Sequence, residues 1–290
     1  MSIHHTLHHP TPHVHWLSAD SSTDRPVLGA ISGESATLIV DAGNSPAHAA
    51  LFLQELAQLQ LAPLKYLVLT HWHWDHVFGT QAINLPSFAH VETKRIVTEM
   101  AHMDWSDRAL DRRVEEGSEI VFCRDNIQKE MPDRRGLVIR PPEISFDCPI
   151  ELDLGGVTCQ IVPVGGDHDI GSTVVCVAED KVLFLGDCLS EDYYSGPPSY
   201  TTRNLFPLIQ RVLGLDADIF LGGHATQPMS RAEMEADLNE MKAIGLEVER
   251  IVLDREAVMT ALPGVLGAPL NEDQVEVADS FLAGLRKFRP

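Results

Sequence analysis

Three histidines and an aspartate fall within six consecutive positions, and this cluster constrains the chain more than any other feature. The segment His-Trp-His-Trp-Asp-His occupies residues 71–76 and directly follows the apolar run 66–70. In an extended segment side chains alternate between faces, so His71 and His73 project together, and a turn at Asp75 and His76 aims a second pair at a neighbouring point. Packing alone does not explain the cluster, because unpaired buried imidazoles are costly. The pattern predicts a metal site in which one segment serves two metals.

Three later apolar runs each lead into a glycine and then into a possible metal ligand. Residues 162–168 end at His168, residues 182–187 end at Asp187, and residues 219–224 end at His224. A short apolar run stopped by glycine is typical of a buried strand that ends in a tight turn. Each run alone is weak evidence for a metal site, because a single His or Asp at a strand end often has a structural role. Their shared form and their order behind the first cluster predict that all three join the same site.

With these motifs the chain resembles the metallo-β-lactamase-fold hydrolase superfamily over most of residues 14–230. The resemblance implies an α/β fold, an αββα four-layer sandwich of two mixed β-sheets flanked by helices. It also implies two metal ions and assigns their ligands, the first metal bound by His71, His73 and His168, the second by Asp75, His76 and His224, with Asp187 bridging both. Asp41 matches the family's strand-end aspartate, which supports the metal loop from behind.

The predicted chemistry is hydrolysis. Nitrogen and oxygen ligands suit zinc, while iron and manganese accept the same groups. We expect a dinuclear hydrolase in which a metal-bridging hydroxide attacks the carbonyl of a small ester, thioester, lactone or lactam, with Asp75 accepting and returning a proton. The alternative is a non-haem iron oxidoreductase, sulfur-oxidising or oxygen-reducing, because such members of the superfamily keep similar ligands. A non-catalytic binding protein is disfavoured by the complete ligand set.

Two features of the motifs depart from the family pattern. Asp167 and Asp169 flank His168, where they either orient its free ring nitrogen or form the turn, and the sequence leaves both interpretations open. Asp187 stands where one major group of true β-lactamases carries cysteine. That difference favours the general hydrolase branches.

Composition limits the partners and the compartment. A net charge of −20 disfavours nucleic acid, which is bound through clustered Lys and Arg, so the expected partner is a small-molecule substrate. The sequence has no uninterrupted apolar run of membrane-spanning length and no signal-peptide pattern at its start, which predicts a cytoplasmic protein without membrane contact. Five cysteines without C-x-x-C spacing predict reduced thiols. The oligomeric state is left open.

We expect a single domain over residues 1–290 with two appended features. Residues 1–13 form a polar, His-rich tail that is predicted to be unstructured. Residues 92–136 are charged and helical in pattern, and their position predicts an insertion that covers the active site, with Trp105 or Met103 facing the metals. Their mixed charges predict a solvated helix face. Tyr193 and Tyr194 are further candidates for the pocket wall.

The remaining pattern predicts strands and helices in a β-rich order. Strands are expected near residues 27–32, 36–40, 65–70, 87–91, 144–154, 157–163, 173–178, 181–186 and 218–221. Helices are expected near residues 46–60, 202–214, 230–245 and 272–286, the first of them started by Ser45 and Pro46. Two β-rich halves with helices outside fit two sheets packed face to face between helical layers.

Overall fold

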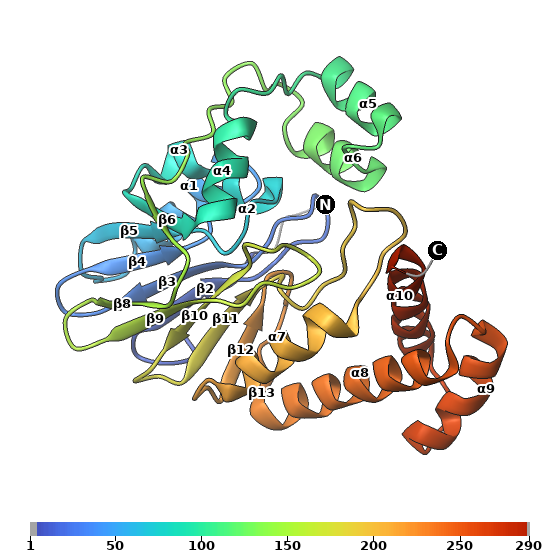
Figure 1. Cartoon of the computed structure of the whole chain (residues 1–290). Helices are drawn as coiled ribbons and strands as arrows, with labels where there is room; N and C mark the ends of the chain where they lie inside the picture. Colours follow the sequence, from blue (N-terminus) through green and yellow to red (C-terminus); the bar gives the residue numbers. More distant parts are fainter. Residues whose placement is uncertain (1–4, 289–290) are drawn as a thin grey trace.

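Two β-sheets pack face to face between helical layers in the computed structural model, which describes residues 5–288 (Figure 1). The first sheet has the strand order β1-β2-β3-β4-β5-β6-β7. Its strands are β1 (Leu7–His8), β2 (Val14–Leu17), β3 (Leu28–Ser32), β4 (Thr37–Val40), β5 (Leu64–Val68), β6 (Ser87–His90) and β7 (Ile144–Phe146). Strands β1 to β4 pair antiparallel and β4 to β7 pair parallel, so the sheet is mixed.

The second sheet is also mixed and has the order β13-β12-β11-β10-β9-β8. Its strands are β8 (Ile150–Asp153), β9 (Thr158–Pro163), β10 (Thr173–Val177), β11 (Val182–Gly186), β12 (Ile219–Gly222) and β13 (Met229–Ser230). Only β11 and β12 pair parallel. Both are short and fully apolar until glycine ends them, as expected for strands that are covered on both faces.

Helices cover the outer face of each sheet, which confirms the predicted four-layer sandwich. Over the first sheet lie α1 (Pro46–Leu56), α2 (Trp74–Val77), α3 (Thr80–Ile83) and α4 (Val91–Met100). Over the second lie α7 (Thr202–Gly214) and α8 (Arg231–Ile251), while α9 (Arg255–Leu266) and α10 (Glu272–Phe288) pack against α8 beyond the end of the sheet. The pair α5 (Asp107–Glu116) and α6 (Val121–Glu130) stands beyond the edge of the sheets (Figure 1).

Three apolar clusters hold these layers together. One lies between the sheets and includes Trp16, Val68 and Phe184, while the other two lie between each sheet and its helices. Sheet-to-sheet contact is close, since a Cβ added at Gly29 would meet the Phe184 ring at 2.5 Å. Helix α1 begins as predicted, with the Ser45 side chain accepting a hydrogen bond from the His48 amide and proline at the first helical position.

The N-terminal segment is not the unstructured tail that the composition predicted. Within residues 5–13, β1 pairs with β2 and the His8 ring stacks on Trp16 at 4.3 Å between centroids. The Asp180 carboxylate accepts from the His13 amide. Residues 1–4 of the predicted tail lie outside the described part of the chain. Pairing with a sheet edge and stacking on an indole provide packing that a polar composition does not reveal.

The stretch 144–154 forms two strands that belong to different sheets. Strand β7 closes the parallel end of the first sheet, and β8 is the outer strand of the second. Pro149 lies between them and has no amide hydrogen to donate to a ladder, so the pairing breaks there. Helix α9 was not predicted from the sequence.

We predict that Phe184→Ala lowers the free energy of unfolding by about 3–5 kcal/mol, because it leaves a cavity between the two sheets. The matched control is Phe122→Ala, because Phe122 is 58% exposed and its loss should change stability by less than about 1 kcal/mol. Urea unfolding followed by circular dichroism measures both. Equal effects of the two variants would contradict the placement of Phe184 between the sheets.

Candidate metal centre

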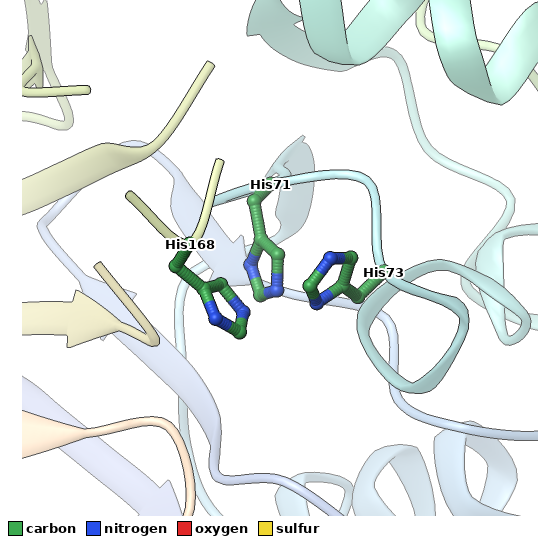
Figure 2. A group of neighbouring side chains, drawn as sticks. All are labelled: His71, His73 and His168. Atoms are coloured by element: carbon green, nitrogen blue, oxygen red, sulfur yellow. The ribbon is translucent and has the colours of Figure 1, made fainter. Parts of the chain in front are cut away.

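Three of the predicted metal ligands meet at the edge of the sandwich. His71 and His73 lie on the loop that follows β5, and His168 lies on the loop that follows β9. Figure 2 shows the three rings turned toward one another, and the ring centroid of His73 lies 4.3 Å from that of His168. One nitrogen of each ring falls within 4.8 Å of the others. The three side chains thus form a first group with the spacing that a single cation needs.

The other four predicted ligands form a second group beside the first. Asp75 and His76 lie in α2, Asp187 directly follows β11, and His224 lies two residues after the end of β12. The Nε2 atom of His224 lies 3.2 Å from Oδ2 of Asp75 and 3.2 Å from Oδ2 of Asp187. Asp187 also approaches the first group, because its Oδ2 lies 3.8 Å from Nε2 of His168. Its position between the groups is the one expected of a bridging ligand, a role that stays a prediction.

Asp41 holds the metal loop from behind, at the end of β4. Its carboxylate accepts hydrogen bonds from the amide and the hydroxyl of Thr70, at 2.7 and 2.8 Å. The same carboxylate accepts from Nδ1 of His76 at 2.8 Å, which leaves Nε2 of that ring pointing to the second group. Asp41 has a φ of 62°, a backbone region that non-glycine residues seldom adopt. These three hydrogen bonds stabilise Asp41 in this unfavourable backbone conformation.

His168 is oriented by a backbone carbonyl and not by the aspartates beside it. Its Nδ1 donates to the Glu191 carbonyl at 2.9 Å. Asp167 instead accepts from the amide and hydroxyl of Thr201 at the start of α7, and Asp169 accepts from the Trp72 indole at 3.1 Å. The interpretation that these carboxylates orient His168 is therefore wrong. They join the loop to α7 and to Trp72.

The second group requires glycine on the His224 loop. A Cβ atom added at Gly223 would lie 1.9 Å from Oδ1 of Asp187, closer than any real contact. The Gly223 amide donates to the Gly186 carbonyl at 2.8 Å, which holds the ends of β11 and β12 together. The glycines that stop these strands thus let two ligands approach each other.

The chemistry of the seven side chains fits divalent cations. Within these seven side chains, five buried atoms have no hydrogen-bond partner among the described residues. They are Nε2 of His71, His73, His76 and His168 and Oδ2 of Asp75. Burial, and then the neighbouring imidazoles, hold the pKa of His71 and His73 well below the ordinary value, so both rings are neutral at pH 7 and carry a free lone pair. Buried acceptors left unpaired in this way are costly unless a cation binds them.

Asp24 lies at the same centre, and sequence reasoning missed it. Its Oδ1 lies 3.5 Å from Nδ1 of His224, on the ring side away from the second group. Backbone hydrogen bonds join the surrounding loop to the His224 loop, from Val27 to Gly223 at 2.6 Å and from Ala19 to Ala225 at 3.4 Å. In the sequence, the residues around Asp24 indicate only a polar turn. The sequence does not indicate that this turn lies against residues 200 positions away.

A cavity of about 430 Å³ opens onto both groups. Its walls are Asp24, His73, Asp75, Ile120, Phe122, Cys123, His168, Asp187, Ser190, Tyr193, Tyr194 and His224. Tyr193 and Tyr194 therefore line it, as the sequence suggested. The expectation for Trp105 and Met103 is wrong, because the lining residues from the 92–136 segment are Ile120, Phe122 and Cys123. Trp105 instead packs edge-on against Phe78 at 4.7 Å between centroids.

Helix α6, which forms one wall of this cavity, is anchored at both ends. At its C-terminal end the buried Glu130 carboxylate pairs with Arg25 at 2.7 Å and accepts from Ser45 at 2.6 Å. Before its N-terminal end, Glu119 accepts from the Tyr194 hydroxyl at 3.1 Å. The predicted solvated face holds for exposed pairs such as Arg112 with Glu116, but not for Glu130, whose side chain is 3% exposed. Two carboxylates of the charged segment thus fix the wall in place.

Comparisons with known proteins concern the family and the fold of the chain. The family model described as the metallo-beta-lactamase superfamily matches residues 28–224. A curated relative, the 2,4-dinitroanisole O-demethylase subunit alpha of Nocardioides sp. (strain JS1661), is 24% identical over 247 residues, which are 79% of this chain and 64% of that protein. The chain thus spans less than two thirds of the length of that relative.

Solved structures share the fold at low sequence identity. A metallo-beta-lactamase from Pontibacter korlensis has a TM-score of 0.55 at 18% identity, over 81% of this chain and 98% of that one. A metallo-beta-lactamase from Hirschia baltica has a TM-score of 0.56 at 15% identity, over 81% of this chain and 96% of that one. These similarities concern the sandwich itself.

We predict that Asp41→Asn weakens binding of a divalent metal by roughly 10–100-fold, because an amide has one acceptor oxygen where the carboxylate uses two, one for the Thr70 amide and the other for the Thr70 hydroxyl and His76. Calorimetric titration of metal-free protein with Zn²⁺ measures the change. Asp180→Asn is the matched control, since Asp180 also accepts hydrogen bonds but lies in the turn between β10 and β11. Unchanged zinc affinity in Asp41→Asn would show that Asp41 does not support the ligands.

Proposed function

Because the chain belongs to the metallo-beta-lactamase superfamily of metal-dependent enzymes, we propose that it is a dinuclear metal-dependent hydrolase, most simply a zinc enzyme, for small carbonyl substrates. The main support for this proposal is that five buried ligand atoms without a hydrogen-bond partner lie together at the base of one cavity. Esters, thioesters, lactones and lactams present a carbonyl that such a site can accept. The cavity of about 430 Å³ fits a small molecule.

The seven side chains fall into two groups of metal ligands and one bridging residue in this proposal. His71, His73 and His168 would hold one cation, Asp75, His76 and His224 would hold the other, and Asp187 would contact both. Bound cations would polarise a carbonyl oxygen and lower the pKa of water toward neutrality, which supplies the nucleophile. Asp75 lines the cavity, so its carboxylate can take up a proton and return it to the leaving group.

A second reaction is supported by the name of the curated relative. That protein is named as a subunit of a 2,4-dinitroanisole O-demethylase, so the substrate of the relative is an aryl methyl ether. Removal of a methyl group from an aryl ether is therefore the second candidate activity for this chain. The iron-dependent oxidoreductase predicted from the sequence remains a third, and iron content with oxygen uptake would distinguish it.

The expected partner remains a small molecule, because a net charge of −20 opposes binding to nucleic acid. Among residues 5–288, no helix has both the length and the apolar character needed to cross a bilayer. All five cysteines are unpaired, and burial raises the pKa of the Cys159, Cys176 and Cys188 thiols. Free cysteines of this kind, four of them buried, support our proposal of a cytoplasmic location.

We predict two metal ions per chain in metal-replete protein and measurable turnover of at least one class in a panel of esters, thioesters, lactones, lactams, phosphodiesters and aryl methyl ethers. Elemental analysis of untagged protein gives the count, and the panel gives the reaction. One ion or fewer, with no second site on titration, would contradict the dinuclear proposal. Turnover of the ethers alone would replace the proposed hydrolase by the second candidate.

We predict that Asp187→Ala keeps the fold, weakens the second metal site most and lowers kcat by about 100-fold or more, because two neighbouring cations lose the carboxylate between them. Metal titration and steady-state kinetics measure the two effects. Asp216→Ala is the control, since Asp216 is exposed and its carboxylate pairs with Lys181 at 3.3 Å. Near-normal activity of Asp187→Ala would show that the bridge is misplaced.

A further inference from the structure

The cavity beside the metal centre has two chemically different ends. At its base lie the polar side chains of the two metal groups. Its remaining walls are mainly apolar or aromatic and come from Ile120, Phe122, Cys123, Tyr193 and Tyr194, with the Tyr194 hydroxyl 3.5 Å from the Cys123 sulfur. A substrate whose reacting carbonyl sits at the base places the rest of its structure against these walls.

Phe122 is the most unusual of these wall residues. It is 58% exposed, although a large apolar side chain in contact with water brings no stability to the fold. It lies in the first turn of α6 and lines the cavity, where its neighbour Ile120 lies as well. Exposed aromatic side chains on the wall of a pocket are typical of ligand-binding sites.

The wall carries no cationic side chain. Within residues 5–288 the lining includes neither Lys nor Arg, and its acidic member outside the metal groups is Asp24. The guanidinium of Arg25, the residue after Asp24, is not available to bind a substrate anion, because its Nε and Nη2 atoms donate hydrogen bonds to the Glu130 carboxylate. An anionic group away from the reacting carbonyl would therefore leave water without finding a partner, which is costly.

Two of the three cations that line the groove beyond Tyr193 are bound by the protein itself. Tyr193 separates the cavity from a groove against α10, where Lys287 binds Asp192 at 3.0 Å and also donates to Ser199. Arg255 in the same groove forms two hydrogen bonds to Asp279. The third, Arg286, is exposed and is bound by no carboxylate among residues 5–288, so the free positive charge of this region lies in the groove and not on the cavity wall.

The wall is held in a fixed position before any ligand binds. Tyr194 donates to Glu119, and its ring lies 5.2 Å from that of His73, so one residue contacts both the wall and the metal groups. Glu130 anchors the other end of α6. A preformed apolar wall lowers the entropy cost of binding a rigid, flat ligand.

We infer that this site selects substrates whose non-reacting part is uncharged and aromatic or apolar, with Phe122 as the specificity-determining contact. The inference rests on the proposed hydrolase function and specifies its substrate class. It predicts a substrate of about one aromatic ring beside the scissile carbonyl. It also predicts discrimination against an otherwise matched substrate that carries a carboxylate on that ring.

The test compares 4-tert-butylphenyl acetate with 4-carboxyphenyl acetate on the metal-replete full chain, each rate corrected for uncatalysed hydrolysis. We expect kcat/KM to be at least about tenfold lower for the carboxylate. Phe122→Lys should reduce this ratio about fivefold or more, because it places a cation on the wall. Val121→Lys is the matched control, since Val121 is 52% exposed and lies outside the lining.

The outcomes separate this inference from the proposed function. Hydrolysis of both acetates at similar kcat/KM, or equal effects of Phe122→Lys and Val121→Lys, would overturn the inference and leave the hydrolase proposal standing. Where no ester is cleaved, calorimetry with acetanilide, an uncharged aromatic amide, replaces kinetics. Binding that weakens about fivefold or more in Phe122→Ala but not in Val121→Ala would support the inference without the hydrolase. Binding indifferent to both variants would overturn it.

Discussion

Seven side chains that could bind metal must be held close together at one edge of two packed sheets, and the rest of the structure depends on this constraint. Four imidazole nitrogens and one carboxylate oxygen are buried there without a protein partner. Each such atom costs about 1–3 kcal/mol in the absence of a cation. The apolar contact between the sheets offsets that cost, and it also fixes the strand ends from which His168, Asp187 and His224 project.

The same edge is joined to the N-terminal part of the chain through a set of carboxylates. Asp41 holds Thr70 and His76, Asp24 lies against His224, and Glu130 joins α6 to Arg25 and Ser45. Because Ser45 also caps α1, one glutamate connects the first helix, the N-terminal loop and the cavity wall. The candidate metal centre and its wall are therefore parts of one hydrogen-bonded assembly.

Much of the fold follows from local pattern. Helix α7 occupies the predicted residues 202–214, and α1 begins at the predicted Ser45 cap. Errors arise where an element depends on a distant partner. Residues 7–8 form a strand only because β2 provides an edge, and the stretch 144–154 divides between two sheets around Pro149. Glu130 belongs to a charged stretch typical of a solvated face, yet Arg25, 105 positions earlier, buries it.

The sequence by itself determined the residue types of the metal centre and the family of the fold. His71, His73, Asp75 and His76 are neighbours in the chain, so the sequence alone predicts that they form one site. A glycine precedes each of the later candidate ligands at the end of an apolar run. Only the tertiary structure decided what surrounds these residues. Ile120 and Phe122 show no periodic or spatial signal within a charged segment, and Asp24 belongs to an ordinary polar turn. Their roles arise because folding places them against residues far away in the chain, and such contacts leave no local pattern in the sequence.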